Sequence, residues 1–275
     1  MNERQTVADL AVESGMLSLD RAILLLRALS SAGESGLRLV DLQVRTELPK
    51  ATVHRLLSAL SRHGFVVRGT EDKRYRIGQE LAFLALSTLD READLYVVGM
   101  RSAAELAHES GDTVCLLARS GIDSVCLGRQ FGSYPIKALT INVGDRRLLG
   151  IGASSVAILA SMGAEECDRL IDTNSQLASR LGTSYDRKRV RSDIEEARRQ
   201  GFAFSDGVFH VGVRTVAVAI RDFRGEPIAA LVVAAIAERI PKARIHALAQ
   251  ALIRERKNIE KTLNPAGRTG QLRVA

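Results

Sequence analysis

The chain has no run of eighteen consecutive apolar residues, and its first fifteen residues, MNERQTVADLAVESG, lack the apolar segment of a secretion signal. A membrane-spanning helix needs about twenty mostly apolar residues, and an export signal needs an apolar core. We therefore expect a cytoplasmic protein without a membrane partner.

Disulfide and metal-binding patterns are also missing. Cys115, Cys126 and Cys167 cannot all pair, and no two of them have the Cys-x-x-Cys spacing, which argues against a disulfide framework or a zinc ribbon. We expect Cys115 and Cys126 on neighbouring strands, as small buried side chains rather than as a redox switch. The five histidines show no metal-binding spacing. We expect no metal and no cofactor.

Common enzyme motifs are absent as well. Ser154 and Ser155 lie close behind Gly152 but do not form the G-x-S-x-G elbow, and no glycine-rich nucleotide loop occurs. His210 near Asp206 could form an acid–base pair, but a polar loop between strands explains both residues more simply. An enzyme with an accessory DNA-binding arm stays open as an alternative.

The charge is unevenly distributed along a chain of 275 residues, which is long enough for two compact domains. Residues 50–78 contain seven basic and two acidic side chains, whereas residues 79–238 carry a small net negative charge. A local positive excess is typical of a surface that binds a polyanion. A second excess, in residues 239–275, is spread along a predicted helix and tail, as on a solvated surface.

The segment LPKATVHRLLSALSRHGFVVR, residues 48–68, predicts a helix with one apolar and one basic face. Its apolar residues recur with helical spacing at Val53, Leu56, Leu57 and Leu60. Two helices are predicted before it. Ser18 is expected to cap the first, whose predicted inner stripe is Leu19, Ala22, Ile23, Leu26 and Leu29, and the second is a short helix over Val40–Thr46. The tight turn before the third helix indicates a helix-turn-helix, and the hairpin FVVRGTEDKRYRI indicates the wing of a winged helix.

We therefore expect double-stranded operator DNA as a partner. A recognition helix enters the major groove by its N-terminal end, so we expect base contacts from Lys50, Thr52, His54 and Arg55. The wing residues Arg68, Lys73 and Arg74 are expected to meet phosphates or the minor groove. An ordinary solvated basic face is the alternative for all seven.

The rest of the chain predicts an α+β fold. Two strands are predicted at Thr113–Ala118 and Ser124–Gln130, and two strongly apolar segments, residues 213–222 and 226–236, predict central strands. The expected organisation is a disordered arm (1–17), the winged helix-turn-helix (18–78), a linker helix (79–92), an effector-binding α/β domain (93–263) and a flexible tail (264–275).

Together these segments resemble the IclR family of bacterial transcription regulators over nearly all of residues 18–262. The similar pieces, in the family's order, are SLDRAILLLRAL, LPKATVHRLLSALSRHGFVVR, RYRIGQEL, NVGDRRLLGIGASSVAILA, and GFAFSDGV followed by GVRTVAVAIRDFRGEPIAALVVAAIAERI. The resemblance implies DNA binding by the winged helix, a GAF/PAS-like effector-binding domain, a homodimer or homotetramer, and no catalysis.

The resemblance also implies a small-molecule effector pocket. The small-residue turn before a helix at Ala153 presents main-chain N–H groups suited to a carboxylate, although a simple helix cap is the alternative. By resemblance, this loop, the segment 201–208 and the two central strands line the pocket, and the candidate effector-binding residues are Gly152, Ala153, Ser154, Ser205, Thr215, Val232 and Ala234.

The chain departs from the pattern of relatives that bind small glyoxylate-like acids. Those relatives have a carboxylate at the position of Ser205, a cysteine at Thr215, and serines at Val232 and Ala234. With fewer polar partners, a small polar acid would bury unpaired oxygens. We therefore predict a more apolar effector, such as an aromatic or branched carboxylic acid, that shifts the DNA-binding units through the linker helix. A role without an effector is the alternative.

Overall fold

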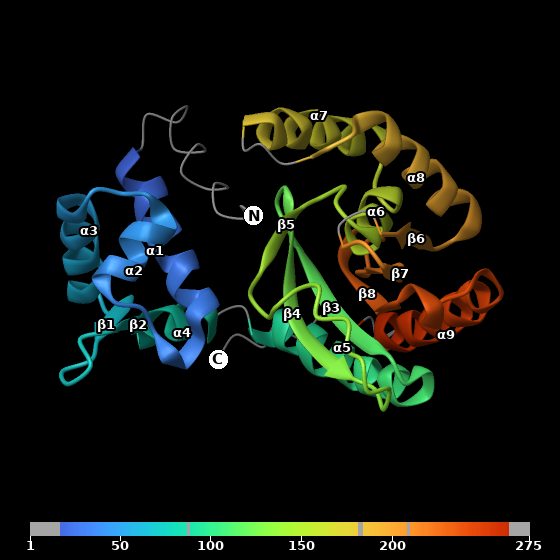
Figure 1. The fold of residues 1–275 in the computed structure, drawn as a ribbon, viewed down its shortest axis with the longest axis horizontal. Coiled ribbons are helices and arrows are strands. Elements are labelled where there is room, and N and C mark those ends of the chain that lie inside the picture. The colour runs from blue at the N-terminus through green and yellow to red at the C-terminus, as the bar shows by residue number, and fades with distance from the viewer. Residues whose placement is uncertain (1–16, 87–88, 181–183, 208–209, 264–275) are drawn as a thin grey trace, which may run out of the picture. The chain divides into compact units, whose positions relative to one another are not determined.

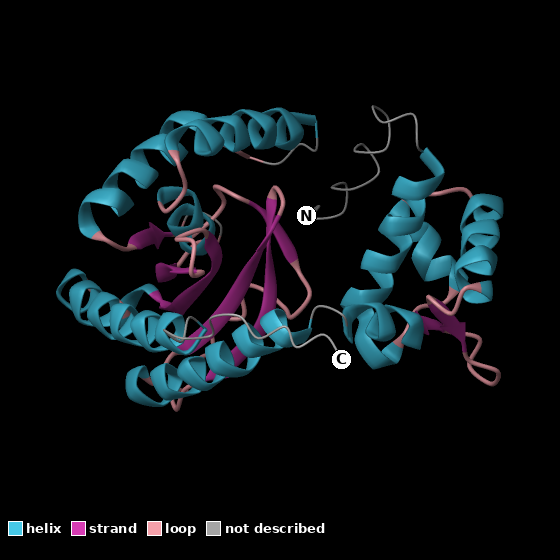
Figure 2. Cartoon of the chain, turned by 180° about the vertical axis from the view of Figure 1, so that it is seen from behind, coloured by secondary structure: helices cyan, strands magenta, loops and turns pink. Residues whose placement is uncertain are grey.

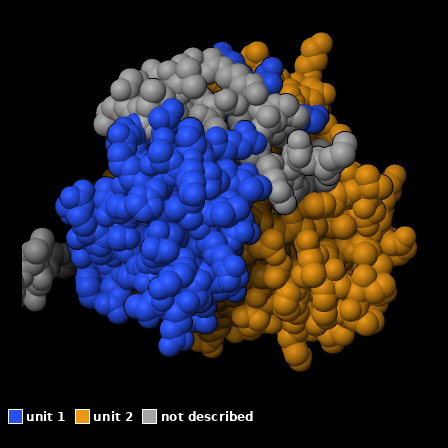
Figure 3. Space-filling model, turned by 60° about the vertical axis from the view of Figure 1, so that its left-hand side comes forward, with its two compact units in different colours: residues 1–90, 176–184 blue, residues 91–175, 185–275 orange. Residues whose placement is uncertain are grey.

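A computed structural model of the chain describes residues 17–86, 89–180, 184–207 and 210–263. The chain divides into two compact units, one of residues 1–90 with 176–184 and one of residues 91–175 with 185–275, coloured in Figure 3. Apart from Leu17, the predicted arm and tail lie outside the described residues. Across the described residues, no helix has both the length and the apolar character to cross a bilayer.

The first unit contains three helices followed by a hairpin (Figure 1), namely α1 (Leu17–Ala32), α2 (Leu39–Thr46), α3 (Lys50–Arg62), β1 (Val66–Arg68) and β2 (Tyr75–Ile77). The two strands pair antiparallel, with Val66 opposite Ile77. Leu25, Leu29, Leu42, Val53 and Leu57 form its core, each at most 1% exposed. The predicted winged helix-turn-helix is confirmed.

The predicted inner stripe of α1 was partly wrong. Leu24 and Leu25 are buried, whereas Leu19 is 50% and Ile23 37% exposed. Residues 24–26 are three consecutive leucines, so more than one set of helically spaced residues could form the apolar stripe. Spacing alone could not show which set faces the core. Ser18 lies inside the helix rather than before it.

The segment predicted as a linker helix, residues 79–92, is helical wherever the structure describes it. It comprises α4 (Gln79–Leu86) and the start of α5 (Leu89–Ser110), which has 22 residues, while residues 87–88 lie outside the described residues. Residues 90–92 therefore belong to the long helix.

The second unit contains a six-stranded antiparallel sheet in the order β5-β4-β3-β8-β7-β6. The strands are β3 (Thr113–Ser120), β4 (Asp123–Phe131), β5 (Arg146–Leu148), β6 (Ala203–Asp206), β7 (Val213–Arg221) and β8 (Pro227–Ile236). The expected strands are confirmed, as are the expected neighbouring strands for the buried Cys115 and Cys126.

Helices cover both faces of this sheet (Figures 1 and 2). α5 and α9 (Lys242–Leu263) pack on one face, against alternate residues that include Leu116, Val218 and Leu231. The opposite face, with Cys115, Ala217 and Val232, packs against α6 (Ala153–Ala160), α7 (Ala164–Arg180) and α8 (Arg187–Gln200). The strand period of two thus divides the domain into two apolar layers.

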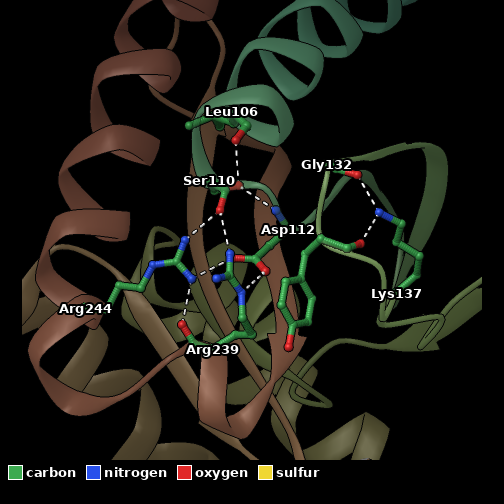
Figure 4. A network of polar contacts seen from close by, with 8 residues as sticks. Leu106, Ser110, Asp112, Gly132, Lys137, Arg239 and Arg244 are labelled. Carbon is green, nitrogen blue, oxygen red and sulfur yellow. Dashed lines mark hydrogen bonds and ion pairs between the residues drawn. The ribbon is translucent and has the colours of Figure 1, made fainter.

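A buried carboxylate ties the first of these layers together (Figure 4). The side chain of Asp112 is 1% exposed and accepts from Arg239 at 3.0 Å and from Arg244 at 2.7 Å. Both arginines also donate to the Ser110 carbonyl oxygen, at the end of α5. Asp112 therefore joins the end of α5 and the start of β3 to Arg239, before α9, and to Arg244, in the first turn of α9.

Replacing Asp112 should destabilise the second unit strongly. Asp112→Ala leaves two half-buried guanidinium groups without their carboxylate, and we expect the free energy of unfolding to fall by about 3 kcal/mol. Glu105→Ala is the matched control, because the Glu105–Arg101 pair on α5 is largely exposed and such pairs contribute less than about 1 kcal/mol. Urea denaturation measures both; equal losses would contradict the role of Asp112.

Candidate DNA-binding surface and ligand pocket

α3 presents the basic face that the sequence predicts. Glu47, in a left-handed conformation with φ of 55°, ends α2, and Leu48 and Pro49 lead into α3. The apolar residues of α3 are buried in the unit's core. Three of the four predicted base-contacting residues are exposed, namely Lys50, His54 and Arg55. The fourth, Thr52, is half-buried.

The wing presents two of its three predicted basic residues to solvent. Arg68 is exposed and its guanidinium lies 5.3 Å from the centre of the Tyr75 ring. Lys73 is exposed in the turn, with φ of 55°. Arg74 is half-buried, and its guanidinium donates to the Gly36 carbonyl oxygen at 3.1 Å. The structure thus gives Arg74 a bond inside the unit.

An acidic residue holds the turn of the wing. Asp72 accepts from the guanidinium of Arg76 at 2.5 Å and from the main-chain amide of Arg74 at 3.0 Å. These two hydrogen bonds lower the pKa of Asp72 to about 2. Its carboxylate therefore stays ionised across the physiological pH range and keeps the turn closed next to Lys73.

The second unit contains a pocket on the face of the sheet that α6 covers. It is partly open, and the empty space within its outline, open solvent included, is about 520 Å³. All seven residues that the sequence proposed for the effector lie on its wall, together with seven others, namely Cys115, Leu117, Thr140, Ile141, Arg147, His210 and Val213.

Strand register explains how the candidate residues come together. Ser205 on β6 lies opposite Thr215 on β7, and Thr215 lies opposite Ala234 on β8. Val232, two residues before Ala234, lies on the same face and is paired with Cys115 on β3. Small side chains from four strands therefore form the floor of the pocket.

The loop before α6 forms another wall. Gly152, with φ of 82°, precedes α6, and no described side chain caps the helix. Two side chains hold the start of this loop, because Asn174 and Tyr185 both donate to the Leu149 carbonyl oxygen at 2.9 Å. Burial raises the pKa of Tyr185, so its hydroxyl remains a hydrogen-bond donor. The geometry places Gly152, Ala153 and Ser154 at the pocket.

Sequence reasoning missed Arg147 and set His210 aside as part of a polar loop. The Nε2 atom of His210 lies 3.0 Å from the Thr140 carbonyl oxygen and 3.5 Å from the Arg147 guanidinium, which also donates to Thr140. Nε2 cannot donate to Thr140 and accept from Arg147 at once, so the shorter contact assigns the proton to Nε2. Thr140 therefore accepts from both side chains.

Cys115 is an unreactive part of the pocket floor. A hydrogen bond with Cys126 and burial both raise the pKa of the Cys115 thiol. The thiolate is the nucleophilic form of cysteine. Cys115 therefore contributes a small, weakly polar surface rather than a nucleophile.

Each of the two units matches a known protein family. Residues 18–69 match the family described as "IclR helix-turn-helix domain", and residues 90–261 match "Bacterial transcriptional regulator IclR C-terminal". The chain is 24% identical to the transcriptional repressor IclR of Escherichia coli K12 and 26% identical to the acetate operon repressor of Salmonella typhimurium LT2, with 93% of each chain covered.

Solved structures share the fold. An IclR transcriptional regulator from Alicyclobacillus acidocaldarius matches with a TM-score of 0.69 and 19% identity. An IclR homologue from Microbacterium hydrocarbonoxydans, solved in complex with 4-hydroxybenzoate, matches with a TM-score of 0.67 and 21% identity. Each match spans 90% of this chain and 98% of the solved chain.

The C-terminal match alone spans more than half of the chain, and the N-terminal match coincides with the winged helix-turn-helix. The relatives are named as repressors and regulators rather than as enzymes, which removes the enzyme alternative. The chain therefore belongs to the IclR family of DNA-binding transcriptional regulators.

Proposed function

We propose that this regulator responds to a relatively apolar carboxylic acid bound in the pocket of its second unit. The observation that carries the proposal is the convergence of all seven effector candidates, from four separate elements, around one pocket. A ligand that binds two conformations of the chain unequally would change its affinity for operator DNA.

The lining supports an acid with an apolar carbon skeleton. Leu117, Val232 and Ala234 offer hydrocarbon surface, while the main chain at Gly152 and the side chain of Arg147 offer polar groups suited to a carboxylate. The homologue from Microbacterium hydrocarbonoxydans was solved with 4-hydroxybenzoate, an aromatic acid. We infer that the effector class of this chain is an aromatic or branched acid.

For DNA, we propose that Lys50, Thr52, His54 and Arg55 face base edges. Arg68 and Lys73 of the wing would meet phosphates or the minor groove, with a smaller contribution from Arg74 because of its bond to Gly36.

We further propose that the protein acts in the cytoplasm as a homodimer or homotetramer on a pseudo-palindromic operator. A two-fold symmetric protein presents two recognition helices to two half-sites. α4 exposes Phe83 and Leu84, each more than half accessible, and exposed large apolar side chains are suited to a subunit interface. Sedimentation equilibrium measures the assembly, and a monomer at the concentration that binds DNA would contradict it.

Removal of Arg55 should weaken operator binding. We expect Arg55→Ala to raise the Kd by about 10- to 100-fold for a duplex that the wild-type protein selects from a random-sequence pool. Arg101→Ala removes the same charge from an exposed position of α5 and should bind like wild type. Fluorescence anisotropy over a salt titration measures the Kd. Wild-type affinity of Arg55→Ala at every salt concentration would show that the reading helix is wrongly assigned.

Aromatic and branched acids should stabilise the protein more than small hydroxy acids. A ligand at one hundred times its Kd adds about 2.7 kcal/mol to the free energy of unfolding. We expect benzoate, 4-hydroxybenzoate and 3-methylbutanoate to raise the melting temperature, and glyoxylate and lactate to leave it unchanged. Arg55→Ala, altered in the other unit, should respond like wild type. Stabilisation by glyoxylate or lactate but not by the ring-bearing acids would refute the apolar pocket.

A further inference from the structure

The strongest charge in the pocket comes from an edge strand. Among the described residues that line the pocket, Arg147 is the one with a permanent charge. We propose that Arg147 is the specificity residue that binds the carboxylate of the effector, and that it distinguishes an acid from its neutral amide. This inference rests on the proposed acid-binding function of the pocket.

Strand register places the guanidinium on the pocket side. Arg147 on β5 lies opposite Ser124 on β4, and the hydroxyl of the fully buried Ser124 lies 3.0 Å from that of Ser155 on α6. Residues directly opposite in antiparallel strands share a face, so Arg147 lies on the face that α6 covers. Arg146, one residue earlier, lies on the other face and pairs with Asp123 at 3.0 Å.

The Arg147 guanidinium contacts a neutral carbonyl oxygen, and a carboxylate would be a stronger partner for it. Arg147 donates to the Thr140 carbonyl oxygen, which also accepts from His210. A carboxylate binds a guanidinium through two parallel hydrogen bonds and adds full charge attraction, so it is a stronger partner than a carbonyl oxygen. Thr140 keeps His210 as a donor when Arg147 turns toward a ligand, so this carbonyl oxygen stays hydrogen-bonded.

The rest of the pocket determines which carbon skeleton the acid can have. Val232, Ala234 and Leu117 belong to central strands, away from the edge strand that carries Arg147. An acid whose carboxylate lies against Arg147 would therefore extend its carbon skeleton over the apolar floor. The class of ligand is a monocarboxylic acid with an apolar body. Its carboxylate is recognised by the charge of Arg147, and its carbon skeleton by the shape of the apolar floor.

The test compares charge removal at two adjacent arginines. Arg147→Met keeps an apolar stem and removes the charge, and Arg146→Met does the same on the opposite face. Isothermal titration calorimetry gives the Kd of benzoate, 4-hydroxybenzoate and 3-methylbutanoate and of their primary amides for each variant. We expect the Kd of the acids to rise about 10- to 100-fold in Arg147→Met, the Kd of the amides to change little, and Arg146→Met to match wild type.

Arg147→Lys provides a second variant if the methionine variant does not fold. It keeps a charge but not the bidentate geometry, so we expect an intermediate loss for acids. If acids keep their preference over amides in Arg147→Met, or bind Arg147→Lys as tightly as wild type, the assignment of Arg147 is wrong while the acid-binding function stands. If none of the acids binds the wild-type protein, the acid-binding function is wrong, and the assignment of Arg147 falls with it.

Discussion

Successive residues of a β-strand point to opposite faces, and the central strands β7 and β8 use this alternation to make two different surfaces. Toward α5 and α9 they present large branched side chains such as Val218, Ile220 and Leu231, which fill the space beneath those helices. Toward α6 they present mostly alanine, including Ala217 and Ala230. The volume that small side chains leave on this second face, at its end near Thr215 and Ala234, is the pocket.

The pocket also needs a wall that does not collapse into it, and hydrogen bonds to main-chain carbonyls supply that rigidity. Asn174 and Tyr185 hold the Leu149 carbonyl, and Gly150 lies so close to the Tyr185 hydroxyl that any Cβ there would collide with it. On the other side Arg129 donates to the Ile141 carbonyl at 2.7 Å. Preformed walls lower the ordering cost of ligand binding.

Spacing along the sequence predicted elements whose apolar pattern is long and unambiguous. The heptad-like positions of α3 and the alternation in the two central strands both fall in this class. It failed where the pattern was degenerate, as in the leucine run of α1. Arg147 was missed because β5 has only three residues, too few for alternation to show which of Arg146 and Arg147 faces inward.

The apolar floor of the pocket and the charged Arg147 beside it favour different parts of a ligand. The sequence departures at Ser205, Thr215, Val232 and Ala234 concern only the floor, and in our proposal they favour an apolar carbon skeleton. Arg147 and His210 line the pocket from an edge strand and a connecting segment, where sequence patterns are weakest and where substitutions disturb the core least. In our proposal the size and apolar character of the floor select the carbon skeleton of the ligand, and the charge of Arg147 selects its head group.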